Sequence, residues 1–270
     1  MKDEILAALK QLETRHGCKV LFAAESGSRA WGFASSDSDY DVRAVYVNPL
    51  DWYLSTDAAP KDTIETMLPG DLDISAWELR KALRLFAGCN LPFCEWLTSP
   101  IQYFAVPGFL EEMREMLPKF FNPVKATHHY LSLAKQAHSS IDVNGTISLK
   151  KLFYLLRGTL AAKWCCQFQT MPPVLFTDLL IADLIPQNLL TCVIGLLEQK
   201  RVADEKARAE FSEDLRAFFE NTQQSCLEMA AAIKPHSPSR DILDDILRKW
   251  VKLNENGLMP VCVLHSHRRG

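Results

Sequence analysis

The spacing of apolar and polar positions divides the chain into two parts. Up to about residue 105, short apolar runs typical of strands alternate with helical segments. Further along, apolar residues recur almost only at the three- and four-residue spacing of amphipathic helices. The pattern predicts an α+β fold, with a head containing a small mixed sheet at residues 1–106, an all-helical domain at 107–258 and a flexible tail at 259–270.

Individual elements follow from the same pattern and its breakers. The head is predicted to contain a helix at 2–16, strands at 19–24 and 39–47, and a hairpin of strands at 64–68 and 71–75 around Pro69-Gly70. Ser75 and Glu78 have the spacing of a capping box and predict the start of the next helix. Helices of the second part are predicted at 108–117, 124–139, 149–168, 176–180, 188–199, 202–234 and 241–253.

Three aspartates, Asp37, Asp39 and Asp41, stand at alternate positions where the second strand begins. Alternate strand residues share a face, with Cα atoms about 6.6 Å apart, so Asp39 and Asp41 are expected to point the same way. Fixed carboxylates repel each other unless a cation lies between them. Mg²⁺ suits such a pair together with phosphate oxygens, and Mn²⁺ accepts the same ligands.

A calcium loop is the competing interpretation of these aspartates. Counted from Asp37, positions six and twelve of such a loop are Gly and Glu, whereas this chain has Val42 and Asn48 there. The calcium loop is therefore excluded. Asp37 itself is predicted to be a turn residue rather than a metal ligand.

A glycine turn precedes the aspartates. Gly27 and Ser28 follow the first predicted strand, and a turn of this kind lets the backbone approach a phosphate group closely. Arg29 comes next, either as a surface residue or as a charge that pairs with a triphosphate. A strand, this turn and a carboxylate pair on the following strand predict a site for phosphoryl transfer.

This stretch resembles the DNA polymerase β-like nucleotidyltransferase superfamily, and within it a bacterial branch of predicted nucleotidyltransferases that includes RNA-ligase-associated repair polymerases. The matching positions are Gly27, Ser28, Gly32, Asp39 and Asp41. The resemblance implies transfer of a nucleoside monophosphate from an NTP, such as ATP, to a hydroxyl group, with release of pyrophosphate. It also implies two Mg²⁺ ions, with the Gly-Ser turn on the phosphates.

The resemblance further implies a third carboxylate on a later strand. Asp73 is the candidate, because it alternates with apolar Leu72 and Ile74. Asp71 and Glu65 are the competing positions. The predicted metal ligands and catalytic residues are thus Asp39, Asp41 and Asp73.

In the helical part, Lys151, Tyr154 and Arg157 recur every three residues along one flank of a helix. These three residues are either a solvent-exposed helix face or a group that binds the base and the triphosphate of a nucleotide, and the sequence leaves both hypotheses open. Related predicted nucleotidyltransferases resemble this chain in carrying a similar Lys, Tyr and Arg helix.

Composition narrows the partners only slightly. The net charge of −3 gives no strong basic field for nucleic acid, and the acceptor stays open between an RNA end, a protein and a small molecule. No apolar run has the length of a membrane span and the N-terminus lacks a secretory pattern, so a cytoplasmic protein is expected. The alternative function is an NTP-binding regulatory or toxin–antitoxin-type protein with little turnover. Oligomeric state is not encoded in any visible pattern.

Overall fold

The structure is a computed structural model, and it describes residues 1–35, 38–56, 61–68, 70–202, 207–234 and 238–260, without the side chains of residues 201 and 202. The predicted turn role of Asp37 lies outside the described residues. So does most of the predicted tail, residues 261–270.

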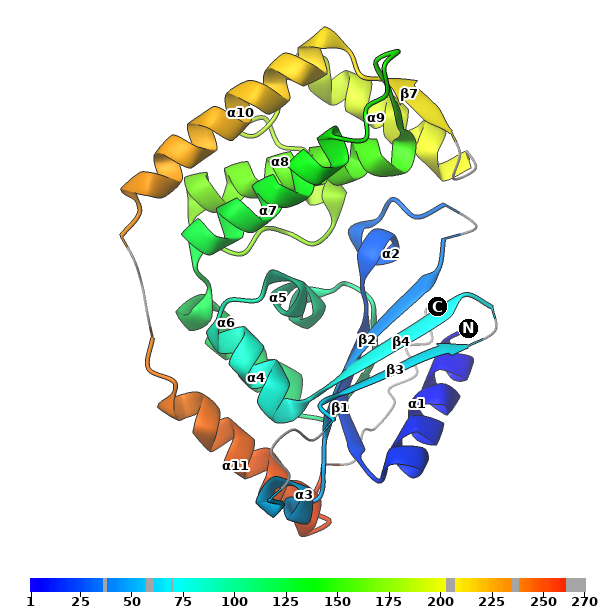
Figure 1. The fold of residues 1–270 in the computed structure, drawn as a ribbon, viewed down its shortest axis with the longest axis vertical. Coiled ribbons are helices and arrows are strands. Elements are labelled where there is room, and N and C mark those ends of the chain that lie inside the picture. Colours follow the sequence, from blue (N-terminus) through cyan, green and yellow to red (C-terminus); the bar gives the residue numbers. More distant parts are fainter. Residues whose placement is uncertain (36–37, 57–60, 69, 203–206, 235–237, 261–270) are drawn as a thin grey trace, which may run out of the picture.

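A mixed sheet forms the centre of the head (Figure 1). In the described part of the chain it has five strands in the order β3-β4-β2-β1-β5. Their bounds are β1 Lys19–Glu25, β2 Tyr40–Val47, β3 Thr63–Leu68, β4 Leu72–Glu78 and β5 Gln102–Ala105. β2 pairs with β4 in parallel, and the other pairings are antiparallel. The predicted mixed sheet and the hairpin of β3 and β4 are confirmed.

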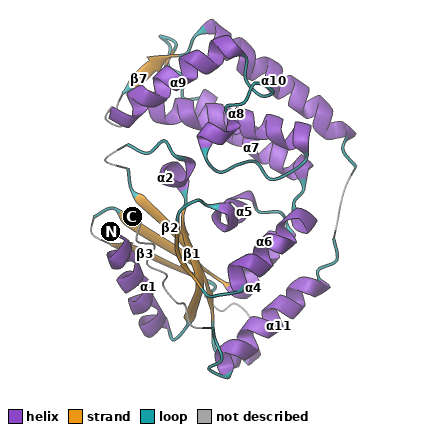
Figure 2. Ribbon diagram, turned by 180° about the vertical axis from the view of Figure 1, so that it is seen from behind, coloured by secondary structure: helices purple, strands orange, loops and turns teal. Residues whose placement is uncertain are grey.

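Helices cover both faces of this sheet (Figure 2). On one face, the apolar stripe of α1 (Lys2–His16) is buried in one cluster with alternate residues of β2, such as Val42 and Ala44. The opposite face packs against α4, α5, α6 and α11. These helices span Leu79–Ala87, Leu91–Thr98, Phe109–Phe120 and Asp241–Glu255, and the short helix α3 is Leu50–Leu54.

The packing of α6 and α11 bears on the predicted domain boundary at 106/107. Buried residues of both helices, including Phe109 and Trp250, belong to the same apolar cluster as Phe22 of β1. The rings of Phe109 and Trp250 are 5.2 Å apart and nearly perpendicular. In space, therefore, α11 returns to the head, although the boundary itself stays a prediction.

The remaining helices form a separate layer above the sheet (Figure 1). They are α7 Pro123–His138, α8 Leu149–Phe168, the 3₁₀ helix Phe176–Leu179, α9 Gln187–Val202 and α10 Glu213–Ala232, with a small antiparallel sheet of β6 Thr146–Ser148 and β7 Arg208–Glu210. α8 is buried along most of its length, as its nearly continuous apolar sequence requires. No helix in the described ranges is long and apolar enough to cross a membrane.

Two predicted elements are wrong. The capping box of Ser75 and Glu78 does not form, because β4 continues through Glu78 and Ser75 pairs with Arg43. Glu78 caps α4 by itself, accepting from the backbone N–H groups of Arg80 and Lys81 at 2.8 and 3.1 Å. The helix predicted at 202–234 is likewise wrong in its first part, since residues 208–210 form β7, which pairs with β6, and helix α10 begins only at Glu213. Strand β5 was not predicted.

Candidate active site

Helix α2 (Gly27–Trp31) forms the predicted glycine turn between β1 and the aspartates. Gly27 has φ +63°, and a Cβ atom at this position would lie 2.5 Å from Oδ2 of Asp41. The N–H of Ser26 donates to the backbone oxygen of Asp41 at 2.9 Å. The turn is therefore packed directly onto the predicted metal ligand, and any residue other than glycine at its first position would be strained and would displace the Asp41 carboxylate or the turn.

Asp41 faces Asp73 across the sheet. The two residues are direct partners in the parallel register of β2 and β4, and their side chains are 33% and 30% exposed. Asp71 and Glu65, the competing candidates, lie elsewhere: Asp71 is in the turn before β4, and Glu65 pairs with Ser75 from β3. The structure thus brings Asp73 to Asp41.

Arg43 lies between these two carboxylates, and sequence reasoning missed it. Its Nη2 is 2.8 Å from Oδ1 of Asp41 and 2.8 Å from Oδ2 of Asp73. Its position two residues beyond Asp41, on the same strand face, was the available signal. A cationic group already spans the carboxylate pair.

Asp39 is exposed and lies immediately before β2. Arg29 fixes the backbone of residues 38 and 39, just before β2. Its Nε donates to the backbone oxygen of Asp39 at 2.9 Å, and its Nη2 donates to the backbone oxygen of Ser38. The Arg29 guanidinium also lies 3.7 Å from the ring centre of Tyr40. Arg29 thus fixes the loop that presents Asp39, and its predicted contact with a triphosphate stays a prediction.

The electrostatics of the site centre on Asp41. Burial raises the pKa of its carboxyl, Arg43 opposes that rise, and the negative charges of Asp73 and Asp39 add to it. Lys150, at the start of α8, also lowers the Asp41 pKa. A lysine of the helical layer therefore acts on the carboxylates of the head.

Glu25, at the end of β1, supports Asp41 from the interior. Its side chain accepts from the N–H of Asp41 at 2.8 Å and from the hydroxyl of Tyr103. Glu25 is fully buried, and this burial raises its pKa. The first bond constrains the start of β2, and the second fixes the Glu25 side chain that makes it.

The predicted α8 group differs in exposure from residue to residue: Lys151, Tyr154 and Arg157 are not all on the surface. Lys151 is exposed, and its Nζ lies 5.9 Å from the ring centre of Tyr154. Tyr154 packs edge-on against Trp31 of α2, with ring centres 5.0 Å apart. Arg157 is fully buried. Their joint contact with a nucleotide stays a prediction, and the structure separates Arg157 from the surface.

Arg157 belongs to a buried polar network around Glu95 of α5. Its Nη2 donates to Glu95 at 2.9 Å, the Tyr130 hydroxyl of α7 donates at 2.7 Å, and the Trp31 indole N–H donates at 3.0 Å. The Arg157 guanidinium also lies 4.3 Å from the Trp31 ring centre. The network therefore ties the glycine turn to both α7 and α8.

A second link joins the helical layer to the loop before Asp39. Lys200 of α9 is 2% exposed and donates to Oγ of Ser35 at 3.2 Å. Ser35 is in turn bonded to Ser38, whose Oγ accepts from the Ser35 N–H at 3.0 Å. The position of Asp39 thus depends on contacts from α9 as well as from α2.

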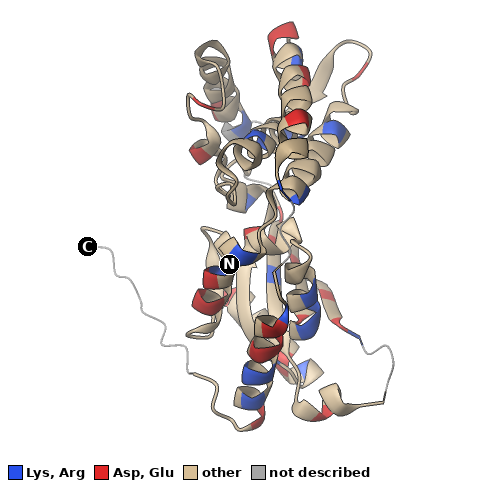
Figure 3. Ribbon diagram, turned by 90° about the vertical axis from the view of Figure 1, so that its left-hand side faces the viewer, with Lys and Arg blue, Asp and Glu red and all other residues tan. Residues whose placement is uncertain are grey.

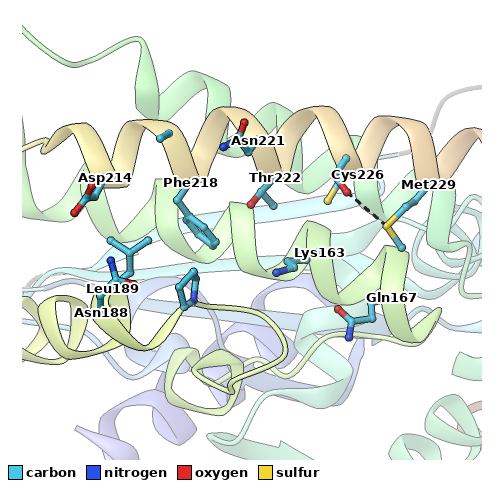
Figure 4. A pocket seen from close by; sticks show the side chains of 13 residues that line it. Lys163, Gln167, Asn188, Leu189, Asp214, Phe218, Asn221, Thr222, Cys226 and Met229 are labelled. Carbon is cyan, nitrogen blue, oxygen red and sulfur yellow. Dashed lines mark hydrogen bonds between the residues drawn. The ribbon is translucent and has the colours of Figure 1, made fainter.

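A cavity of about 420 Å³ lies apart from these residues, between α8, α9 and α10 (Figure 4). Lys163, Phe218 and Cys226 point into it, and Lys163 donates to the backbone oxygen of Leu184 at 2.9 Å. None of the described residues that line it is a predicted site residue.

Carboxylate oxygens such as those of Asp41 and Asp73 are ligands that divalent cations take, and in this structure two of them converge on one cationic atom. A ready-made cluster is absent: within the described ranges, no three His, Cys, Asp or Glu side chains are arranged to hold a metal ion. The cationic atom that is present belongs to Arg43.

A mixed sheet with a glycine turn packed on strand carboxylates defines a polymerase β-like nucleotidyltransferase. Comparison of the sequence with known families agrees: residues 1–249 match the RNA repair pathway DNA polymerase beta family, and the chain belongs to that family. The predicted superfamily is confirmed.

Individual proteins resemble the chain to different degrees. It is 37% identical over 248 residues to the uncharacterized protein YcgL of Bacillus subtilis (strain 168), covering 92% of this chain and 94% of that protein. A crystal structure of a nucleotidyltransferase-like protein from Exiguobacterium sibiricum 255-15 aligns over 98% of this chain and 96% of its own. Its identity of 10% and TM-score of 0.31 are too low to bear on the fold.

Proposed function

We propose that the protein transfers a nucleoside monophosphate from an NTP to the hydroxyl group of an RNA end and releases pyrophosphate. The observation that carries this proposal is the placement of Asp41 opposite Asp73, directly beside the turn at Gly27. Carboxylates that lie side by side on neighbouring strands repel each other and need positive charge between them. A turn beside them whose backbone can bind phosphate would place the nucleotide next to that charge.

The resemblance implies two divalent ions, Mg²⁺ or Mn²⁺, with Asp39, Asp41 and Asp73 as their ligands; among these carboxylates, Asp39 and Asp41 would hold the ion that arrives with the nucleotide. When bound, such an ion neutralises phosphate charge and favours ionisation of the attacking hydroxyl. The protein's own task is to hold these carboxylates in place. Glu25 does so through the backbone N–H of Asp41, and Arg29 does so through the backbone oxygen of Asp39.

The nucleotide would lie between the glycine turn and the start of α8. Gly27 and Ser28 would contact its phosphates through their backbone, with Arg29 and Lys151 contributing positive charge and Tyr154 contributing an aromatic edge. Arg157 supports this group from the interior, because it pairs with Glu95 and lies against Trp31. We add Lys150 to the residues that would contact the nucleotide, because its positive charge acts on Asp41.

In the reaction, the acceptor oxygen bonds to the α-phosphorus while the bond from that phosphorus to the β-bridging oxygen breaks. Pyrophosphate leaves with the electron pair, and we assign the hydroxyl proton to Asp73. Alignment and charge neutralisation supply most of the rate in such transfers. The RNA acceptor is supported by the description of the family, which refers to RNA repair. Acidic and basic residues are interspersed along both parts of the chain (Figure 3), and the net charge is −3, so an RNA end suits the protein better than a long duplex.

The test is incubation with each α-³²P-labelled NTP and Mg²⁺, with and without total cellular RNA or protein lysate. Label in the RNA fraction, lost in Asp39→Asn and Asp41→Asn, would support the proposal. Label in the protein fraction instead would show that the acceptor is a protein and not an RNA end. NTP binding by calorimetry without any transfer would favour the regulatory alternative.

A further inference from the structure

The Arg43 guanidinium occupies a position that a two-ion mechanism requires to be free. Its Nη2 is 2.8 Å from an oxygen of Asp41 and 2.8 Å from an oxygen of Asp73. A magnesium ion shared by the same two oxygens would lie about 2.0–2.1 Å from each. The ion and the guanidinium nitrogen therefore compete for one place.

Arg43 is held in that place by more than the two carboxylates. Its Nη1 donates to the backbone oxygens of Val42 and Asp73 at 3.2 and 3.4 Å, and its side chain is only 19% exposed. The guanidinium cannot lose its proton in a folded protein, so its charge is permanent. An incoming divalent ion would have to break these bonds and then remain beside a displaced positive charge.

The rest of the site leaves another position for an ion. Asp39 is exposed and lies outside the sheet. It stands two residues before Asp41, whereas Arg43 stands two residues after it. Its backbone is fixed by Arg29, while Asp41 is fixed by Glu25. Asp39, whose negative charge acts on Asp41, is thus the carboxylate left to share an ion with Asp41 while Arg43 stays in place.

We propose that Arg43 permanently takes the place of the ion that two-metal enzymes share between their second and third carboxylates. The protein then works with one divalent ion, held by Asp39 and Asp41 together with the nucleotide. This inference rests on the proposed nucleotidyl transfer. Arg43 is a positioning residue that keeps Asp41 and Asp73 at a fixed separation and supplies the positive charge between them.

Electron paramagnetic resonance of Mn²⁺ tests the inference without relying on turnover. Two Mn²⁺ ions about 3.5–4 Å apart are spin-coupled and differ in spectrum from an isolated ion. The samples are the wild-type chain, Arg43→Gln, Arg43→Gln with Asp73→Asn, and Arg84→Gln. Each contains Mn²⁺ and an equimolar mixture of the four α,β-methylene NTPs, which bind but do not transfer. Arg84 is exposed on α4 and serves as the matched loss of one arginine.

We expect an isolated ion in the wild type and in Arg84→Gln, a coupled pair in Arg43→Gln, and loss of the pair when Asp73→Asn is added. A coupled pair in the wild type would overturn the inference and leave nucleotidyl transfer standing, and this result does not depend on any variant folding. An isolated ion in a folded Arg43→Gln protein would also overturn it. No bound Mn²⁺ in any sample would remove the proposed function together with the inference.

Discussion

Replacement of Gly27 by alanine isolates the contact on which the candidate site depends. Gly27 has φ +63°, and an added Cβ atom would lie 2.5 Å from Oδ2 of Asp41. Gly17, which ends α1, has the same φ of +63° but no atom within 4 Å of an added Cβ. Gly17→Ala is therefore a matched control with the same backbone strain and without the contact.

The two variants separate strain from displacement. An alanine in the left-handed region costs roughly 1–2 kcal/mol, so both variants should lose about that much stability, or roughly 2–4 °C in Tm for each kcal/mol. In Gly27→Ala, the turn or the Asp41 carboxylate must also move by about 0.9 Å to restore an ordinary contact of 3.4 Å. A displacement of about 1 Å at a reacting centre can lower the rate by about 10²-fold.

The assay is label transfer from α-³²P-NTP, with thermal unfolding of the same samples. Gly17→Ala should retain wild-type transfer, and Gly27→Ala should lose about 100-fold or more while remaining folded at the assay temperature. The reasoning would be refuted by wild-type transfer in Gly27→Ala, or by an equal loss of transfer in Gly17→Ala.

Three further outcomes are expected. Asp41→Asn should abolish label transfer and change Tm by no more than a few degrees, because it replaces a partly exposed ion pair worth at most about 1 kcal/mol; retained transfer in the purified variant would remove Asp41 from the mechanism. Glu95→Ala leaves the Arg157 guanidinium buried without its counter-charge and should destabilise the protein by about 3–5 kcal/mol in urea unfolding, whereas a loss below about 1 kcal/mol would contradict the network. Burial raises the Glu25 pKa above its ordinary value of 4.5, so the folded wild type holds that proton more tightly than the unfolded chain. The free energy of unfolding of the wild type should therefore fall relative to that of Glu25→Gln as pH rises through the raised pKa. A difference in unfolding free energy between the two proteins that stays constant from pH 4 to 7 would contradict this.

Local patterns in the sequence were sufficient for several parts of the fold. The helices at 2–16 and 149–168 have the predicted bounds, since each has clear apolar periodicity or an apolar run between strong breakers. The glycine turn at Gly27 and the strand beginning near Asp41 were also predicted, because both depend on neighbouring residues only. The strand β7 within the helix predicted at 202–234 was missed, because β7 is stabilised by a partner strand about 60 residues earlier.

The site itself was decided by tertiary structure. Sequence placed Asp41 and Asp73 on separate strands, but only the parallel pairing of β2 with β4 makes them direct neighbours with Arg43 between them. Successive helix residues differ by about 100° in direction, so the rotation of α8 against the head decides that the charge of Lys150 acts on Asp41. Periodicity along a chain determines which side chains share a face, whereas register and packing between distant segments determine which faces meet.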